Sequence, residues 1–190
     1  MKIRDIIIKN RSYRRFWNDH TIDEMTLRNL VDLARLTPSA SNKQPLKYFL
    51  SFTNRTNDIV FDHIAWAGYL KDWHGPNAEE RPSAYIIILG DRTISTSFGC
   101  DHGIAAQTIL IGAVEKGLGG CIFGSIQRER LSTALKLTAD MEILLVIALG
   151  KPKEEIVLEI VGENGDIKYW RDENQVHHVP KRKLDDIIVN

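Results

Sequence analysis

The stretch from Gly103 to Val114 reads GIAAQTILIGAV and is apolar on nearly every side. It belongs to a predicted helix that runs from about residue 98 to residue 116. A helix without a polar face has to be buried over most of its surface. In a chain of 190 residues, that need for cover suggests a second subunit beside the chain's own elements. The helix is also too short and too rich in Gly and Ala to span a membrane.

Predicted helices and strands lie on both sides of this stretch in a mixed order. A T-x-x-E capping box at residues 21–24 predicts the start of a helix that ends before Pro38. Continuous apolar runs at 83–90 and 141–150 predict buried strands. Because strands and helices do not alternate strictly, the pattern favours an α+β fold. The other expected elements are helices at 2–9, 55–66 and 127–137, strands at 47–53 and 119–123, and a hairpin around Asn164 and Gly165.

Charge and cysteine content argue against several classes of protein. The chain has 25 Lys and Arg against 25 Asp and Glu, so its net charge is 0 at pH 7, whereas nucleic-acid binding draws on a basic excess. Cys100 and Cys121 form no CxxC motif, which argues against a zinc site or a disulfide framework. The apolar run at residues 6–8 is too short for a signal peptide. We expect a cytoplasmic protein with no metal site and no nucleic-acid or membrane partner.

The segment Arg11–Phe16, RSYRRF, places three arginines within five residues. An arginine side chain presents a planar fork that matches phosphate oxygens, and the Ser12 hydroxyl adds a donor. Taken alone, such a segment is most often a solvated surface turn. Two functional alternatives are a nucleic-acid patch, which the neutral net charge disfavours, and a socket for one phosphorylated small molecule.

Three further segments are candidates for binding chemistry. Residues 37–45, TPSASNKQP, contain Asn and Gln amides that suit a heterocycle with adjacent carbonyl and N–H groups, although an ordinary polar loop has the same composition. Residues 117–125, GLGGCIFGS, end a helix instead of following a strand, so their glycines predict a helix cap and not a dinucleotide site. Residues 180–184, PKRKL, are a solvated charge run unless the tail folds back toward RSYRRF.

Taken together and in this order, the four segments resemble the motifs of the nitroreductase family of FMN-dependent oxidoreductases. RSYRRF followed by ARLTPSASNKQP is similar to the family's N-terminal motifs, and GIAAQTILIGAVEKGLGGCIFGS is similar to its central helix and flavin-side turn. The resemblance covers nearly the whole chain. It implies a single domain over residues 1–190, in which about 155–190 form a C-terminal extension packed on a partner subunit. The implied fold is a three-layer sandwich, with helices flanking a mixed, mainly antiparallel sheet, in an intertwined homodimer.

The resemblance also assigns site residues by motif. It implies that Arg11 and Ser12 contact the FMN phosphate, and that Arg14 faces the pyrimidine edge of the flavin as the catalytic residue. Other implied contacts come from the 38–44 loop, of this subunit or of its partner, and from the turn after residue 121. The full implied set is Arg11, Ser12, Tyr13, Arg14, Pro38, Ser39, Ala40, Asn42, Gln44, Ile122, Phe123, Gly124, Lys181 and Lys183.

The implied activity is a two-step, ping-pong cycle. NAD(P)H gives a hydride to FMN, bound tightly but non-covalently at the dimer interface, and a small-molecule oxidant such as a nitroaromatic or a quinone then takes it up. The alternatives are a non-catalytic flavin-binding or sensing protein, and a dehalogenase or flavin-modifying enzyme on the same scaffold.

The sequence departs from the family pattern in three places. Asn10 and Lys183 stand where Arg is frequent, and residues 69–81, which we expect to shape the substrate pocket, match no motif. Arg15 is left between two interpretations, a replacement phosphate contact and a surface charge.

Overall fold

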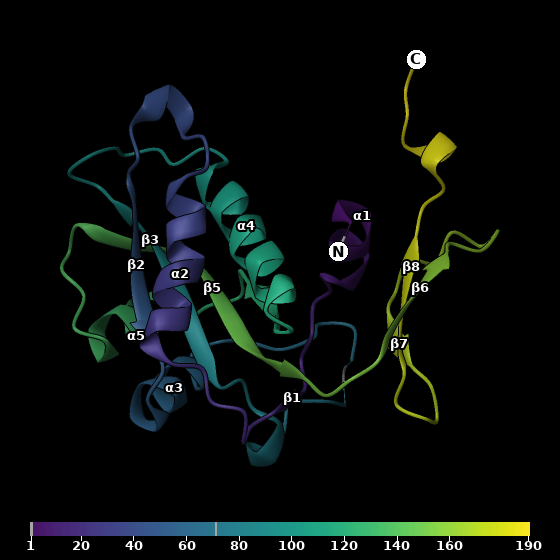
Figure 1. The fold of residues 1–190 in the computed structure, drawn as a ribbon. Helices are drawn as coiled ribbons and strands as arrows, with labels where there is room; N and C mark the ends of the chain where they lie inside the picture. The colour runs from purple at the N-terminus through teal and green to yellow at the C-terminus, as the bar shows by residue number, and fades with distance from the viewer. Residues whose placement is uncertain (1, 71) are drawn as a thin grey trace.

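The computed structural model describes residues 2–70 and 72–190, and its main feature is a five-stranded antiparallel sheet (Figure 1). Strand β5 (Met141–Pro152) lies at the centre and is long enough to pair with three other strands. Strand β3 (Ala84–Asp91) runs along one side of β5, while β4 (Gly119–Phe123) and β1 (Phe16–Trp17) share the other side. Strand β2 (Leu46–Ser51) pairs with the free side of β3.

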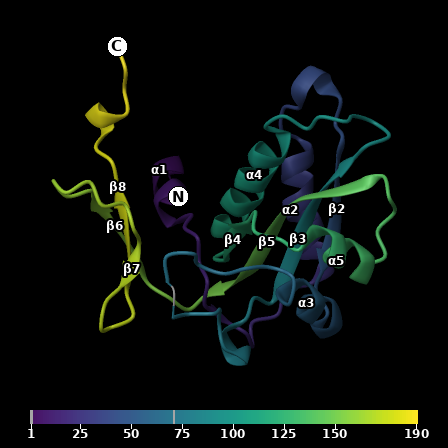
Figure 2. The ribbon, with the colours of Figure 1, turned by 180° about the vertical axis from the view of Figure 1, so that it is seen from behind.

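Helices cover both faces of this sheet. Helices α2 (Glu24–Arg35) and α4 (Asp101–Glu115) lie on one face, and α3 (Asn54–Phe61) and α5 (Arg128–Ala134) lie on the other, as the two opposite views show (Figures 1 and 2). Alternate residues of β3 point to the two sides. Ile86 and Ile88 pack in the core with α2 and α4, whereas Tyr85 and Ile87 pack in the core with α3 and α5. The predicted three-layer α+β sandwich is therefore confirmed.

Helix α4 lies close against α2 because it carries small residues at the contact. A Cβ atom added at Gly112 would lie 2.5 Å from the Cδ1 atom of Leu33 on α2, so a larger residue would push the helices apart. Ile109 is fully buried, but Gly103 and Gln107 are exposed in the single chain. A second subunit that covers the exposed side of α4 at Gly103 and Gln107 stays a prediction. None of the helices in the described ranges is long and apolar enough to cross a membrane.

Three helix boundaries differ from the predicted ones. The Asp23 carboxylate accepts a hydrogen bond from the Thr26 backbone N–H at 2.8 Å, so the N-cap of α2 is Asp23 and not Thr21. The helix predicted at 98–116 begins at Asp101. The helix predicted at 55–66 ends at Phe61, because the chain then extends to form a β-bridge between Ile64 and Ile126. Other expected helices and strands lie within a few residues of their predicted positions.

The C-terminal residues form a separate three-stranded sheet, called here the tail sheet. Strand β8 (His177–Lys181) lies in its middle, parallel to β6 (Ile156–Ile160) and antiparallel to β7 (Trp170–Arg171). Asn164 and Gly165 do lie in a turn, but the strands on its two sides do not pair with each other, so the hairpin predicted there is wrong. The hairpin is closed instead between β7 and β8, where the Asp172 carboxylate accepts the backbone N–H groups of Asn174 and Val176 at 2.9 and 2.8 Å.

Helix α1 (Ile3–Lys9) lies between α4 and the tail sheet in both views (Figures 1 and 2). The described residues also form three short 3-10 turns: η1 (Ala40–Asn42), η2 (Ala78–Glu80) and η3 (Leu184–Asp186). The chain ends in an exposed apolar segment, in which Ile187 is 60% and Val189 is 98% exposed. The space between α1, α4 and the tail sheet contains the candidate site.

Candidate functional site

A cleft of about 370 Å³ lies where the segment after α1 meets α4, β4 and the tail sheet. It brings together five of the residues that the motifs predict, although they are up to 170 positions apart in the chain. These are Arg11, Ser12, Arg14, Ile122 and Lys181. The remaining wall is formed by Asn10, Gln107, Leu110, Tyr169, His177 and Val179. RSYRRF and the first lysine of the C-terminal motif thus meet within one subunit.

The RSYRRF segment runs beside β4. Ser12 forms a bridge with Gly120, and the Tyr13 N–H donates to the Gly120 carbonyl at 3.0 Å. Ser12 and Arg14 line the cleft, whereas Tyr13 packs over Gly119, where an added Cβ would lie 2.5 Å from the Tyr13 Cδ2 atom. Tyr13 was predicted to bind the cofactor, but in this chain its side chain anchors the segment to β4.

The cationic side chains of the cleft have no carboxylate partner within the described ranges. No ion pair is formed by Arg11, Arg14 or Lys181. Arg11 donates from Nη2 to the Ile7 carbonyl at 3.0 Å, and its Nε is buried without a hydrogen-bond partner. Burial lowers the pKa of Arg11, because desolvation disfavours the charged form. A buried donor without a partner indicates a place where a ligand acceptor can bind.

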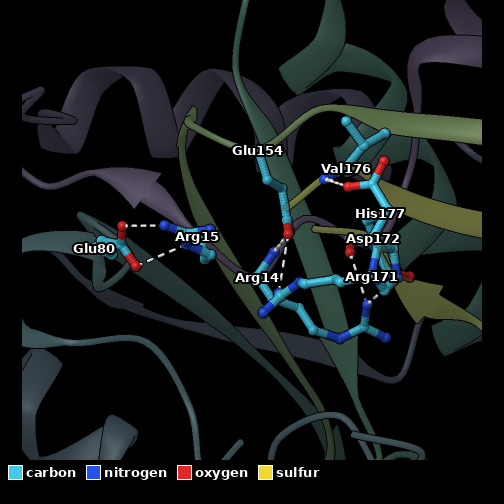
Figure 3. A network of polar contacts seen from close by, with 9 residues as sticks. Arg14, Arg15, Glu80, Glu154, Arg171, Asp172, Val176 and His177 are labelled. Carbon is cyan, nitrogen blue, oxygen red and sulfur yellow. Dashed lines mark hydrogen bonds and ion pairs between the residues drawn. The ribbon is translucent and has the colours of Figure 1, made fainter. Parts of the chain in front are cut away.

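The guanidinium of Arg14 is held by neutral groups, and Figure 3 shows Arg14 beside His177 and Glu154. Its Nη1 lies 3.2 Å from the Ser12 carbonyl oxygen and 3.2 Å from Nε2 of His177. The centre of its guanidinium lies 4.7 Å from the centroid of the Tyr169 ring, which gives a cation–π contact. The backbone N–H of Arg14 donates to the buried Glu154 carboxylate, which fixes the backbone at this point.

The neighbouring arginine has a different role. Arg15 donates two hydrogen bonds to Glu80, at 2.8 and 2.6 Å (Figure 3), and Lys153 approaches the same carboxylate at 2.9 Å. These contacts, chiefly the hydrogen bond from Arg15, lower the pKa of Glu80 to about 2. The two interpretations of Arg15 that the sequence left open are therefore both wrong, because Arg15 is neither a phosphate contact nor a free surface charge but half of a partly buried ion pair.

The predicted loop residues lie at a second place, next to the start of α4. The buried Asp101 carboxylate accepts hydrogen bonds from the Ser39 hydroxyl at 2.6 Å and from the Ala40 N–H at 3.1 Å, and the Gln44 N–H donates to the Ser39 hydroxyl at 2.9 Å. Asn42 and Gln44 have φ angles of 53° and 51°, in the left-handed region. Pro38, Ser39 and Gln44 line a separate small cavity there. Within one chain, this loop does not reach the cleft.

The other predicted residues are divided between the core and the surface. Phe123 is buried and packs edge-on against Trp66, with 4.7 Å between ring centroids. Nothing lies within 4 Å of a Cβ atom added at Gly124, so a flat group has room to approach the backbone there. Lys183 is exposed at the start of η3 and does not line the cleft.

Several residues of the cleft wall lie outside the sequence motifs. The Asn10 amide donates to the Gln107 side chain at 3.3 Å, so the Asn10 position, frequently Arg in the family, forms an amide pair here. Gln107 is an isolated strongly polar residue within the apolar run GIAAQTILIGAV, and this isolation could have marked it as a binding residue. His177 and His178 are adjacent on β8 and point to opposite faces of it, since His177 lines the cleft while His178 pairs with Glu159 at 2.5 Å. Tyr169 carried no sequence signal.

Comparisons with known proteins agree with these features. The family model of the "Nitroreductase family" matches residues 7–151. A curated protein of Archaeoglobus fulgidus, named "Putative NADH dehydrogenase/NAD(P)H nitroreductase", is 26% identical over 157 residues, which are 78% of this chain and 85% of that protein. The match of the family model covers both the RSYRRF segment and the central helix. The chain therefore belongs to the nitroreductase family and is an oxidoreductase.

Solved structures share the fold over the whole chain. A nitroreductase family protein of Streptococcus pneumoniae superposes with a TM-score of 0.72 at 15% identity, covering 100% of both chains. A protein of Desulfovibrio desulfuricans, described as a "putative nitroreductase in complex with FMN", superposes with a TM-score of 0.71 at 23% identity, covering 100% of this chain and 96% of that one. Because both alignments extend to the C-terminus, the tail sheet belongs to the shared fold.

Proposed function

We propose that this chain is an FMN-dependent oxidoreductase that passes a hydride from NAD(P)H, through the bound flavin, to a nitroaromatic, a quinone or a similar acceptor. The observation that carries the proposal is the cleft, where Arg11, Arg14 and Lys181 converge without a carboxylate partner among the residues that the structure describes. FMN would supply the electron-transfer chemistry, and the protein its placement and electrostatics. The FMN named for the relative from Desulfovibrio desulfuricans supports this choice of cofactor.

The donors of the cleft suit the two chemical parts of FMN. A phosphate takes charge-assisted hydrogen bonds from Arg side chains, and the orphaned Arg11 Nε is such a donor. Arg11, Ser12 and Lys181 would hold the phosphate. The Asn10–Gln107 amide pair offers both donors and acceptors for a ring with carbonyl and N–H groups.

Arg14 would act on the electrostatics of the ring. A fixed positive charge next to a group that becomes negative on reduction stabilises that charge without rearranging the site. The cation–π contact with Tyr169 and the backbone bond to Glu154 hold Arg14 in advance, so little ordering is needed when the ligand binds. No acid–base residue is required of the protein in this scheme.

We further propose that the active form is a homodimer with the cofactor at the interface, located in the cytoplasm. Two features support a partner. Leu184, Ile187 and Val189 are 66%, 60% and 98% exposed in the single chain, which is unfavourable for an apolar tail. The 38–44 loop lies at the start of α4, away from the cleft, so a partner's loop would have to complete the site.

The test starts from the purified protein. We expect a yellow preparation, or uptake of added FMN by a colourless one, followed by NAD(P)H oxidation that depends on a quinone or a nitroarene. A protein that binds no FMN contradicts the proposal. FMN binding without turnover would instead support the non-catalytic alternative, and product analysis would identify a dehalogenase or a flavin-modifying enzyme. Light scattering on the full chain and on a chain ending at residue 183 tests the dimer, which we expect the truncation to weaken.

A further inference from the structure

His177 is a fully buried residue at the wall of the cleft that the proposed mechanism does not use. It is the first residue of β8 and only 1% of its surface is exposed. Its Nε2 lies 3.2 Å from Nη1 of Arg14, and its ring lies 5.2 Å from the ring of Tyr169, measured between centroids. Its Nδ1 is buried and has no hydrogen-bond partner within the described ranges.

The contact with Arg14 determines the protonation of the His177 ring. A guanidinium has donors only, so Nε2 has to be the acceptor and the ring proton has to be on Nδ1. The ring is then neutral. Burial, and after it the positive charges of Arg14 and Arg171 and the adjacent His178, lower the pKa of His177 to about 4, which agrees with a neutral ring at pH 7. This tautomer leaves the buried Nδ1–H without an acceptor within the described ranges, which is a cost in the stability of the folded chain.

Arg14 has a neutral acceptor, the His177 ring, whereas the neighbouring arginines have carboxylate partners. Arg15 is bound by Glu80, and Arg171 is bound by Glu154 at 3.0 Å. A carboxylate in place of His177 would hold Arg14 as firmly but would cancel much of its charge, because opposite charges a few ångströms apart interact strongly away from water. An imidazole holds the guanidinium and leaves its charge available.

We propose that His177 is a positioning residue for Arg14: it holds the guanidinium in the cleft as a neutral acceptor, so that the charge of Arg14 acts on an anionic ligand. The proposal rests on the proposed function only for the identity of that ligand, FMN.

Three substitutions at one position separate the effect of hydrogen bonding from that of charge. His177→Gln keeps a neutral acceptor, His177→Phe keeps a buried ring without an acceptor, and His177→Glu keeps an acceptor but adds a negative charge. We expect the dissociation constant of FMN, from fluorescence titration, to stay within about twofold for the Gln variant. For the Phe variant we expect it to rise roughly tenfold, the value of one hydrogen bond to a charged group. For the Glu variant we expect it to rise at least as much.

The pattern among the variants decides the outcome. Equal affinity of the Phe variant and the wild type overturns the proposal, as does a Glu variant that binds as tightly as the Gln variant. A Gln variant as weak as the Phe variant also overturns it, because the position would then matter only for packing. Thermal unfolding of each variant without FMN identifies any that fail to fold, and the midpoint potential of the bound flavin, expected to become more negative in the Phe and Glu variants, gives a second readout.

A measurement without FMN separates this proposal from the proposed function. Nitrogen-15 NMR of the wild-type protein at pH 7 reports the tautomer of His177 directly. We expect a neutral ring with the proton on Nδ1, and an imidazolium or a proton on Nε2 would overturn the proposal. If the wild type takes up no FMN, the proposed function fails while this test of the Arg14–His177 hydrogen bond remains valid.

Discussion

Arg14 and Arg15 are adjacent in the sequence, yet they lie in two opposite electrostatic environments. Arg14 points into the cleft and is held by a carbonyl, an aromatic ring and an imidazole. Arg15 points to the other side and forms a two-pronged ion pair with Glu80 (Figure 3). The segment is extended at this point, so consecutive side chains face opposite sides. The difference teaches that a cluster of like charges in the sequence can contain one residue for binding and one for stability.

The largest expected effect comes from removing the charge in the cleft. In Arg14→Ala, we expect the rate of flavin reduction by NAD(P)H to fall roughly 100-fold, the usual cost of losing one preorganised group at a developing charge. The dissociation constant of FMN should rise less than the rate falls, by roughly tenfold as in His177→Phe, because Arg11 and Lys181 remain. Stopped-flow absorbance measures the rate, with the exposed Arg182→Ala as the matched control. An unchanged reduction rate would remove Arg14 from its catalytic role.

The corresponding change at the next residue should affect stability instead. Arg15→Ala leaves Glu80, whose side chain is only 10% exposed, with Lys153 as its remaining partner. We expect the free energy of unfolding to fall by roughly 2 kcal/mol, because an under-compensated buried charge is costly. The double variant Arg15→Ala/Glu80→Gln should recover part of this loss. Urea unfolding measures the stability of the single and the double variant. If folded Arg15→Ala protein bound FMN more weakly than the wild type, Arg15 would have a binding role and the contrast with Arg14 would be contradicted.

The same ion pair predicts a pH dependence. The pKa of Glu80 in the folded protein is lowered to about 2, from 4.5. A lowered carboxyl pKa stabilises the fold above the unfolded-state value, and the stabilisation is lost as the pH falls from about 4.5 toward 2. We expect Glu80→Gln to be less stable than the wild type at pH 7 and to lose less stability over that range. If the free energy of unfolding fell equally in the two proteins between pH 5 and pH 2, Glu80 would not contribute to the pH dependence of stability.

The smallest expected effect concerns the tail cation. Lys181 is exposed, so water screens its charge. In Lys181→Ala we expect the dissociation constant of FMN to rise about threefold, as an exposed ion pair is worth well under 1 kcal/mol. Riboflavin, which lacks the phosphate, should bind equally to both proteins. Arg182→Ala serves again as the control. If Lys181→Ala weakened the binding of riboflavin as much as that of FMN, Lys181 would not contact the phosphate.

Most elements of the fold could be predicted from local patterns. The apolar runs at 83–90 and 141–150 became β3 and β5, and the strand predicted at 119–123 has those bounds in the structure. The hairpin at Asn164 failed because pairing is decided by which strand can reach which, and β8, which follows later in the chain, takes the place between β6 and β7. The cap at Asp23 was missed because Thr21 and Asp23 are both good N-cap residues and only packing decides between them.

The candidate site could be predicted in part. Motif order supplied Arg11, Arg14 and Lys181, and the structure places all three around one cleft. The order of the motifs could not show that Arg15 binds Glu80, because the two residues are 65 positions apart and no local sequence pattern links them. For the same reason the roles of Asp101 at the 38–44 loop and of Tyr169 beside Arg14 were missed. The assignment of the loop to the flavin stays a prediction, because it depends on a partner subunit.

The sequence by itself determined the elements, the membership in the family and the residue types available for a phosphate and a flavin. These properties depend on side-chain chemistry and on periodicity within about ten residues, which can be followed in the order of the letters. Only the tertiary structure decided which cations stay unpaired. That outcome depends on which carboxylates and which neutral acceptors the fold brings within about 3 Å of each guanidinium. Glu80 brought to Arg15, and His177 brought to Arg14, account for the difference between a stabilising ion pair and a charge left for a ligand.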